Sequence, residues 1–221
     1  VLLLLKDIHS MNKYLRTMYP SLPVFLLGHS MGSFLARLYA NRHPHSIQGL
    51  IIHGTAGKNP VLPLGKLVVA VGKLFHGGRY RSSFVASLAF AGYNSRFPKE
   101  EGEHAWLTRE ISRVSSRDED PFTNFTFTLS AYGDLFSMLG QANSATWFRA
   151  YPKELPTLII SGDADPVGAY GAEYVYKHLL LAGSSAVTLK LYSDCRHELF
   201  NEINREEIFA YISEWIKTNT K

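Results

Sequence analysis

The sequence has little that would support a disulfide, a metal site or a membrane span. Cys195 is its single cysteine among 221 residues, so no internal disulfide can form, and this usage fits a reducing compartment. No Cys and His residues have the spacing of zinc ligands. The apolar run Val1–Leu5 is too short for a signal sequence and is followed at once by Lys6 and Asp7. We expect no metal, no cofactor and a cytoplasmic protein, with peripheral membrane contact as an alternative.

The excess of one sign of charge over the other is also small. Lys and Arg number 23 against 19 Asp and Glu, a net charge of +4, and no basic run is dense enough for a nucleic-acid surface. Hydrophobic residues make up 46% of the chain, which is enough for a sizeable core, and the length suits one α/β domain with an insertion. Asn124 begins a triplet that matches a glycosylation acceptor, and we interpret it as chance because no secretion signal accompanies it. The sequence therefore predicts no nucleic-acid partner, and it carries no signal for an oligomeric state.

A Gly-His-Ser-Met-Gly segment at residues 28–32 is the most informative motif. It follows the apolar run Val24–Leu27 and precedes a helical pattern at residues 34–39. A strand, a Gly-x-Ser-x-Gly turn and a helix form a nucleophile elbow, whose sharp turn leaves no room for bulky residues two positions from the serine. Ser30 is then the candidate nucleophile, and the Met31 backbone N–H is a candidate oxyanion donor at the helix N-terminus. The alternative is a glycine-rich turn with an idle serine.

Helices and strands alternate on both sides of a long interruption, which predicts a parallel sheet. We expect the first helix, at residues 1–18, to pack through Leu4, Ile8, Met11 and Leu15. The other expected core elements are strands at 24–27, 49–53, 155–161 and 187–192, and helices at 30–42 and 169–181, with a last helix through Ile208 and Ile216.

Residues 57 to about 150 contain no convincing buried strand. We expect helices at 62–75, at 84–90, through Trp106 and Ile111, and at 129–139, with a turn at 118–121. The predicted organisation is therefore residues 1–56 as the first part of an α/β core, 57–150 as a helical cap or lid, and 151–221 as the second part of the core.

An activated serine needs a base, and the base needs an acid to fix its tautomer. With a nucleophile elbow, the acid is expected after a late strand and the histidine after the last one. Asp165 follows the strand at 155–161, and His197 follows the strand at 187–192, so both lie at carboxyl ends of strands. Asp163 is the competing acid, although a turn residue bonded to its own backbone is the simpler interpretation.

Other residues near these positions have simpler interpretations. Asp194 lies in the same loop as His197, where a solvated turn residue is more common. His29 lies inside the elbow and His53 ends a strand, so both could line the site, but a late-strand acid would orient them less well than His197. Cys195 stands two residues from His197 and is better explained as a small buried thiol than as a nucleophile.

Three motifs together resemble the monoacylglycerol lipase and lysophospholipase group of α/β-hydrolases, which is grouped with the S33 serine peptidases. These are residues 28–32, the Ser-Gly-Asp-Ala-Asp-Pro-Val segment at 161–167, and Arg-His-Glu at 196–198; the segments 106–109 and 134–136 of the insertion match as well. The resemblance implies an α/β-hydrolase fold, a mostly parallel sheet with helices on both faces. It also implies a triad of Ser30, Asp165 and His197, an oxyanion donor at Met31, and an acyl-chain tunnel beneath a cap.

The sequence departs from this family at its beginning. The family has four strands and a His-Gly motif, with a second oxyanion donor, ahead of the helix with which this sequence starts. We therefore expect an N-terminally truncated fold whose first strands are absent, with one edge of the strand before Ser30 unpaired.

The predicted activity is hydrolysis, through an acyl-enzyme, of a carboxylic ester with an apolar acyl group, such as a monoacylglycerol or lysophospholipid. The partner is then a small lipid ester, and the cap is a candidate for peripheral membrane contact. The cap's apolar residues could line the acyl site or be ordinary packing: Leu62, Leu64, Leu67, Val68, Val71, Leu74 and Phe75. The alternatives are an S33-type aminopeptidase, with Glu100, Glu101 or Glu103 holding the substrate's amino group, and a non-catalytic fragment that lacks half of its oxyanion hole.

Overall fold

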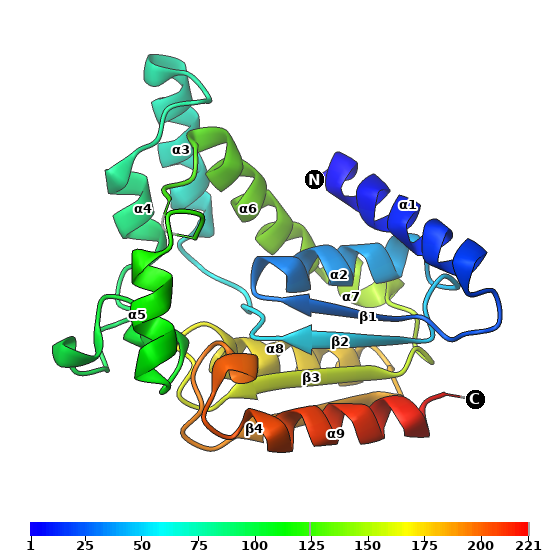
Figure 1. Cartoon of the computed structure of the whole chain (residues 1–221). Helices are drawn as coiled ribbons and strands as arrows, with labels where there is room; N and C mark the ends of the chain where they lie inside the picture. Colours follow the sequence, from blue (N-terminus) through cyan, green and yellow to red (C-terminus); the bar gives the residue numbers. More distant parts are fainter. Residues whose placement is uncertain (124, 221) are drawn as a thin grey trace.

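A parallel four-stranded sheet, in the order β1-β2-β3-β4, forms the centre of the molecule (Figure 1). The structure is a computed structural model that describes residues 1–123 and 125–220. Asn124, which begins the glycosylation-type triplet, lies outside the described residues. The core elements are α1 (Leu2–Met18), β1 (Phe25–His29), α2 (Met31–Arg42), β2 (Gly49–His53), α7 (Ala145–Ala150), β3 (Thr157–Gly162), α8 (Gly168–Leu181), β4 (Val187–Tyr192), η3 (Leu199–Asn201) and α9 (Arg205–Thr218).

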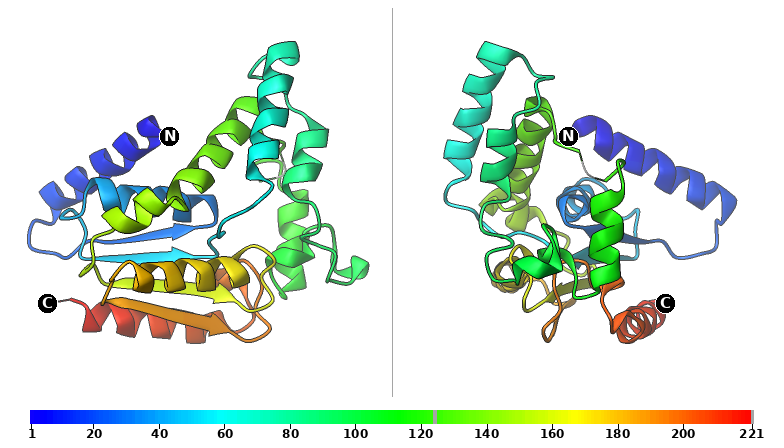
Figure 2. Two further views of the ribbon diagram at one scale, coloured as in Figure 1. Left: turned by 180° about the vertical axis from the view of Figure 1, so that it is seen from behind. Right: turned by 60° about the vertical axis from the view of Figure 1, so that its left-hand side comes forward.

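Helices cover both faces of the sheet, so the two central strands are buried on both sides. Leu50, Ile52 and Ile159 pack in the cluster that includes α2, α7 and α8. Ile51, Leu158 and Ile160 pack on the other face with η3 and α9. Figures 1 and 2 show α8 and α9 on opposite sides of the strands. The predicted α/β class, with a parallel sheet between two helical layers, is confirmed.

Residues 54–156 leave the sheet after β2 and return to it at β3. They contain α3 (Leu62–His76), α4 (Ser83–Ala89), η1 (Lys99–Glu101), η2 (Ala105–Leu107), α5 (Ile111–Glu119) and α6 (Leu129–Ala142), and no strand in the described part of residues 57–150. Helices α3, α4 and α5 stand beyond the carboxyl ends of the strands, and α6 runs from them back over α2 (Figures 1 and 2). None of the helices described anywhere in the chain is long and apolar enough to cross a bilayer.

Two expectations about these helices were wrong. Trp106 and Ile111 do not share a helix, because the 3₁₀ turn η2 ends at Leu107 and extended backbone at Thr108 precedes α5. The side chain of Thr108 bonds to the carbonyl of Asn201, so this break is set by a tertiary contact. Helix α5 also continues to Glu119, into the segment predicted as a turn.

Helix α1 packs through a face that only partly overlaps the predicted one. Ile8 packs against the core as predicted, but Leu4, Met11 and Leu15 are 40%, 59% and 37% exposed, and Leu5 and Asn12 are buried instead. Asn12 is buried because its side-chain amide donates to the carbonyl of Ser46, a contact that hydrophobic periodicity does not reveal. The exposed apolar face of α1 therefore has no packing partner in the described residues.

Strand β1 is an edge strand in the described sheet, paired with β2 alone. The sequence favours a fully buried strand, but Leu27 is 39% exposed. The expectation that one edge of this strand is unpaired agrees with the strand order.

Candidate active site

Ser30 lies in a sharp turn between β1 and α2. Its backbone is at φ 51° and ψ −120°, a positive φ that costs a non-glycine residue energy. Gly28 is required because a Cβ there would lie 2.4 Å from the carbonyl oxygen of Gly32 and 2.7 Å from the Cβ of Ala36. Gly32 itself has open space around a Cβ, so the steric reason predicted for both glycines holds at Gly28 only. The strand, turn and helix thus have the geometry of a nucleophile elbow.

The turn leaves Ser30 facing a cavity. Ser30 and Met31 both line it, and Met31 begins α2, so its N–H is among the first-turn donors without an intrahelical partner. No hydrogen bond joins the Ser30 hydroxyl to His197 in the described part of the chain, and without substrate such catalytic contacts are often long.

Asp165 and His197 are brought together at the carboxyl ends of β3 and β4. His197 Nδ1 lies 2.9 Å from Asp165 Oδ2, and both side chains are almost fully buried. The carboxylate also accepts hydrogen bonds from the Ser161 hydroxyl, at 3.0 Å, and from the Val167 N–H, at 2.8 Å. With Asp165 ionised, Nδ1 carries the imidazole proton and donates it, which leaves Nε2 free to accept one.

The surroundings of Asp165 favour its charged form. Burial alone would raise its pKa, but the hydrogen bond and charge of His197 and the N–H groups of Gly168 and Val167 outweigh burial and hold the pKa below its usual value. Gly168 is needed here, since a Cβ at this position would lie 2.2 Å from Asp165 Oδ2.

The competing residues have other partners. Asp163 accepts a hydrogen bond from the Asp194 N–H at 2.7 Å, so it stabilises the loop rather than the imidazole. Cys195 is fully buried, with its sulfur 3.2 Å from Arg109 Nη2 and 3.3 Å from Asn204 Oδ1. The buried thiol expected at position 195 is confirmed. Asp163 does not act as predicted through its own backbone, because its carboxylate bonds the loop after β4 instead.

His29 and His53 lie beside His197. The His29 ring is 4.7 Å from the His197 ring and 4.2 Å from the His53 ring, between centroids. Burial, followed by the neighbouring His197, lowers the pKa of His29 to about 4. Burial, followed by the nearby imidazoles, lowers the pKa of His53 well below its usual value. Both rings are therefore neutral near pH 7 and form an uncharged wall behind the base.

An apolar cavity of about 380 Å³ begins at Ser30 and extends among the helices of the insertion. The core contributes Ser30, Met31, Phe34, Ala56 and Val167, and the rest of the wall is formed by Asn59, Val61, Leu62, Leu64, Gly65, Leu88, Ala89, Phe90, Tyr93, Trp106, Phe127, Leu135, Phe136 and Leu139. Its volume lies within the range of small-molecule sites. The site can thus hold an apolar group beside a serine and an oriented histidine.

The apolar residues of α3 divide into three groups. Leu62 and Leu64 line the cavity. Val68 packs in the buried cluster between α3, α4 and α6, as ordinary packing. Leu67, Val71, Leu74 and Phe75 do not line it and are 59%, 47%, 81% and 75% exposed. The described residues contain no group of three or more His, Cys, Asp or Glu side chains that could hold a metal ion.

Sequence reasoning missed Trp106 and Tyr93 as parts of the site. The Trp106 ring lies 5.0 Å from the His197 ring and also lines the cavity. Tyr93 packs edge-on against Trp106, and burial, then the charge of Asp165, raises the pKa of its phenol. Trp106 belongs to the segment at 106–109 that matches the family, but no periodic pattern pointed from either residue to the site.

Comparison with known proteins agrees with this geometry. A model of the family described as serine aminopeptidase, S33, matches residues 3–204. The chain belongs to this family. It is 25% identical over 204 residues to a monoacylglycerol lipase of Mycolicibacterium smegmatis and 27% identical over 205 residues to human monoglyceride lipase. These matches cover 90% and 91% of the chain but 63% and 61% of the relatives, so the chain spans less than two thirds of their length.

A solved structure extends the likeness to three dimensions. The crystal structure of a thermostable carboxyl esterase from Bacillus coagulans, in complex with glycerol, superposes with a TM-score of 0.89 at 29% identity. The match covers 97% of this chain and 70% of the esterase. The S33 chain therefore has the α/β-hydrolase fold and resembles monoacylglycerol lipases, as its motifs predict.

Proposed function

We propose that the protein is a serine hydrolase that cleaves carboxylic esters with apolar acyl groups, with monoacylglycerol or lysophospholipid as substrate. The observation that carries the proposal is the apolar cavity of about 380 Å³ that begins at Ser30, beside the buried Asp165–His197 pair. The esters cleaved by the similar lipases belong to the same substrate class. Residues 1–56 and 151–221 then form the catalytic core, and residues 57–150 form a cap whose last helix, α7, packs against that core.

The proposed reaction has two stages. His197 Nε2 takes the proton from Ser30 as its oxygen attacks the ester carbonyl, and the Met31 N–H donates to the oxyanion. His197 then gives that proton to the departing alcohol, which leaves an acyl-enzyme. A water molecule attacks the acyl group while His197 accepts its proton, and the proton returns to Ser30 as the carboxylic acid leaves. Asp165 holds the imidazole in the required tautomer throughout.

The cavity wall favours an ester over a peptide. An aminopeptidase needs an anionic group for the substrate's amino terminus, and the wall formed by described residues contains no Asp or Glu. Of the three candidate glutamates, Glu101 is paired with Arg196 at 2.6 Å, and Glu100 and Glu103 are exposed. An apolar acyl chain fits this wall because each buried methylene contributes about 0.8 kcal/mol.

The proposed cellular location is the cytoplasm, with peripheral contact to a membrane through the cap. The support is an exposed apolar surface on α3 and α4, which includes Leu74, Phe75 and Phe84 at 81%, 75% and 66% exposure. Lys73 and Arg81 lie in the same region of the sequence and would favour an anionic lipid surface.

Two measurements on the full-length protein test the enzymatic proposal. A fluorophosphonate probe is expected to label Ser30, and Ser30→Ala is expected to abolish labelling and ester turnover without loss of the fold. Turnover of p-nitrophenyl esters is expected to rise in kcat/KM by about fourfold per added methylene until the cavity is full. Labelling that survives Ser30→Ala, or no dependence on acyl length, would contradict the proposal.

A matched pair of variants tests the cavity itself. Ala89 lines it, whereas Ala70 lies exposed on α3. Ala89→Trp is expected to lower kcat/KM for long acyl esters far more than for acetate esters, and Ala70→Trp to leave both unchanged. An equal loss for short and long esters would place the acyl group elsewhere.

A further inference from the structure

The loop that carries His197 is tied to the insertion as well as to the sheet. We name residues 101–109 of the insertion the clamp segment and residues 195–202 the histidine loop. The N–H of His197 donates to the carbonyl of Trp106 at 3.4 Å, and the N–H of Glu198 donates to that of Leu107 at 2.7 Å. The backbone at the candidate base is therefore paired with the clamp segment.

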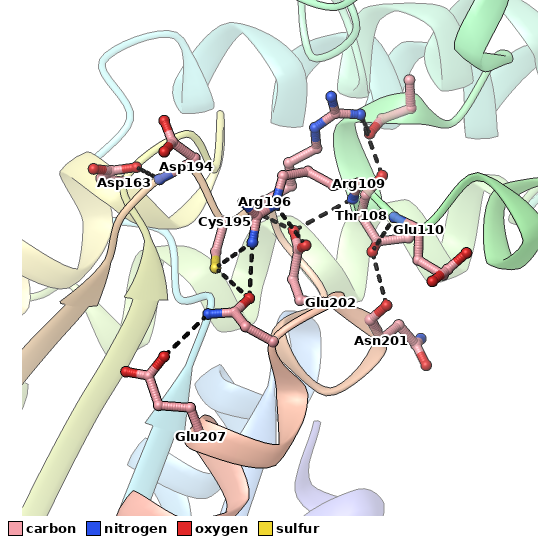
Figure 3. Close-up of polar contacts among 12 residues, drawn as sticks. Thr108, Arg109, Glu110, Asp163, Asp194, Cys195, Arg196, Asn201, Glu202 and Glu207 are labelled. Carbon is pink, nitrogen blue, oxygen red and sulfur yellow. Dashed lines mark hydrogen bonds and ion pairs between the residues drawn. The ribbon is translucent and has the colours of Figure 1, made fainter.

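Arg109 of the clamp segment reaches the histidine loop through its side chain. Its Nε donates to Glu202 Oε2 at 2.8 Å (Figure 3). Its Nη2 donates to Asn204 Oδ1 at 2.7 Å. The Glu202 side chain is fully buried, and its other oxygen accepts the N–H of Arg196 at 2.7 Å. Glu202 thus links Arg109 to the peptide group between Cys195 and Arg196, one residue before His197.

Arg196 makes a second connection in the opposite direction. Its guanidinium donates to Glu101 Oε2 at 2.6 Å and to the carbonyls of Ala105 and Thr108 at 2.7 and 3.2 Å. It also lies 4.2 Å from the centre of the Phe97 ring. The residues on either side of His197 are consequently held by contacts that cross between the two segments.

We propose that Arg109 and Glu202 are positioning residues that aim His197 at Ser30. This inference rests on the proposed function, in which His197 is the base. The hydrogen bond that His197 donates to Asp165 fixes which nitrogen carries the proton, but where the ring lies relative to Ser30 also depends on its own backbone. The Glu202–Arg196 peptide contact fixes the backbone from which the ring projects, and Arg109 holds Glu202 in place. The insertion is then part of the catalytic geometry and more than a cover for the acyl group.

The expected size of the effect follows from the precision that proton transfer needs. Misplacing a catalytic group by about 1 Å can reduce the rate by about 10²-fold. Arg109 holds the buried Glu202 and Asn204 through two different nitrogens, so the single ammonium of a lysine cannot keep the same pair of contacts, and a glutamine at position 202 loses the ion pair. Substrate binding in the apolar cavity does not involve either residue, and KM is expected to change little.

Arg109→Lys and Glu202→Gln test this, with Arg113→Gln as the control because Arg113 is exposed on α5. The full-length protein is assayed with a short acyl ester. The concentration of active sites is taken from the amount of protein that a fluorophosphonate labels at completion, and kcat is calculated from it. Both variants are expected to lose about 10- to 100-fold in kcat and in the rate of labelling, with KM nearly unchanged, while the control matches the parent. If Glu202→Gln does not fold, Arg109→Lys decides, since it keeps the charge and loses the forked contact.

A purely structural role would give a different result. Variants with a lower melting temperature but normal kcat per labelled serine would overturn the proposal. If the proposed function itself is wrong, the parent protein has no turnover that depends on Ser30. In that case the position of His197 is measured by proton NMR instead. The signal of its Nδ1–H, which bonds to Asp165, is expected to shift or broaden in both variants but not in the control. An unchanged signal in both would overturn the inference.

Discussion

At the scale of single residues, the choice between Asp165 and Asp163 depends on one contact. Asp165 meets His197 Nδ1 at 2.9 Å, whereas Asp163 accepts the N–H of Asp194. Asp165→Asn is expected to lower kcat by about 10³–10⁴-fold, because an amide at this position favours the wrong imidazole tautomer. Asp163→Asn is expected to leave kcat nearly unchanged. Steady-state kinetics of the two variants check this, and the reverse ranking would assign the acid to Asp163.

His29 and His53 make stability depend on pH. Their pKa values are lowered in the folded protein, to about 4 for His29, against about 6.5 in an unfolded chain. The unfolded state therefore binds more protons below pH 6.5, and each histidine lowers the free energy of unfolding by about 1.4 kcal/mol per pH unit on acidification. The pKa of Asp165 is lowered in the folded protein, so its carboxylate stabilises the fold above the pKa that it has in the unfolded chain. That stabilisation is lost only at lower pH, as the folded protein takes up the proton.

Urea denaturation at pH 7.5, 6 and 5 measures this dependence. His53→Gln is expected to reduce the slope between pH 6 and 5 by about 1.4 kcal/mol per pH unit, and His45→Gln, at an exposed position, to leave it unchanged. An identical slope in the parent and His53→Gln would show that His53 does not resist protonation in the fold.

At the scale of elements, the packing of β1 against α2 depends on Gly28. Gly28→Ala places a methyl group 2.4 Å from the Gly32 carbonyl oxygen, so the strand and helix must separate. We expect a loss of about 1–3 kcal/mol in the free energy of unfolding, with lower turnover because Ser30 moves. Gly32→Ala meets nothing within 4 Å and is expected to be neutral or stabilising. Urea denaturation of both variants checks the contrast, and equal losses would contradict it.

The elements could be predicted wherever local pattern and tertiary environment agree. Strands β2 and β4 have the predicted bounds, at residues 49–53 and 187–192, because buried apolar runs end at Gly or polar turns. The elbow, Asp165 and His197 followed from chain order and strand ends. The packing face of α1 and the break at Thr108 could not be predicted, since both depend on hydrogen bonds to distant backbone carbonyls. The Arg109–Glu202 pair joins residues 93 positions apart, a distance no local pattern records.

At the scale of the whole molecule, one side of the described sheet is open. Leu27 on the β1 edge and Leu4, Met11 and Leu15 on α1 expose apolar side chains together with unpaired strand backbone. The protein is therefore expected to self-associate through this edge and this face of α1. Leu27→Lys is expected to reduce this association, whereas Leu74→Lys on α3 is not. Light scattering checks it, and a monomer at high protein concentration would contradict it.

The placement of the three tryptophans has a spectroscopic consequence. Trp147 is buried beneath the Arg37 guanidinium, and Trp215 packs edge-on against Phe25 at the far side of the sheet. Trp106 is the one that borders the cavity, with the His197 imidazole 5.0 Å from its ring. Its fluorescence should respond both to an apolar guest and to protonation of the neighbouring imidazole. The protein therefore contains its own optical probe, through which filling of the cavity can be followed in real time without a dye.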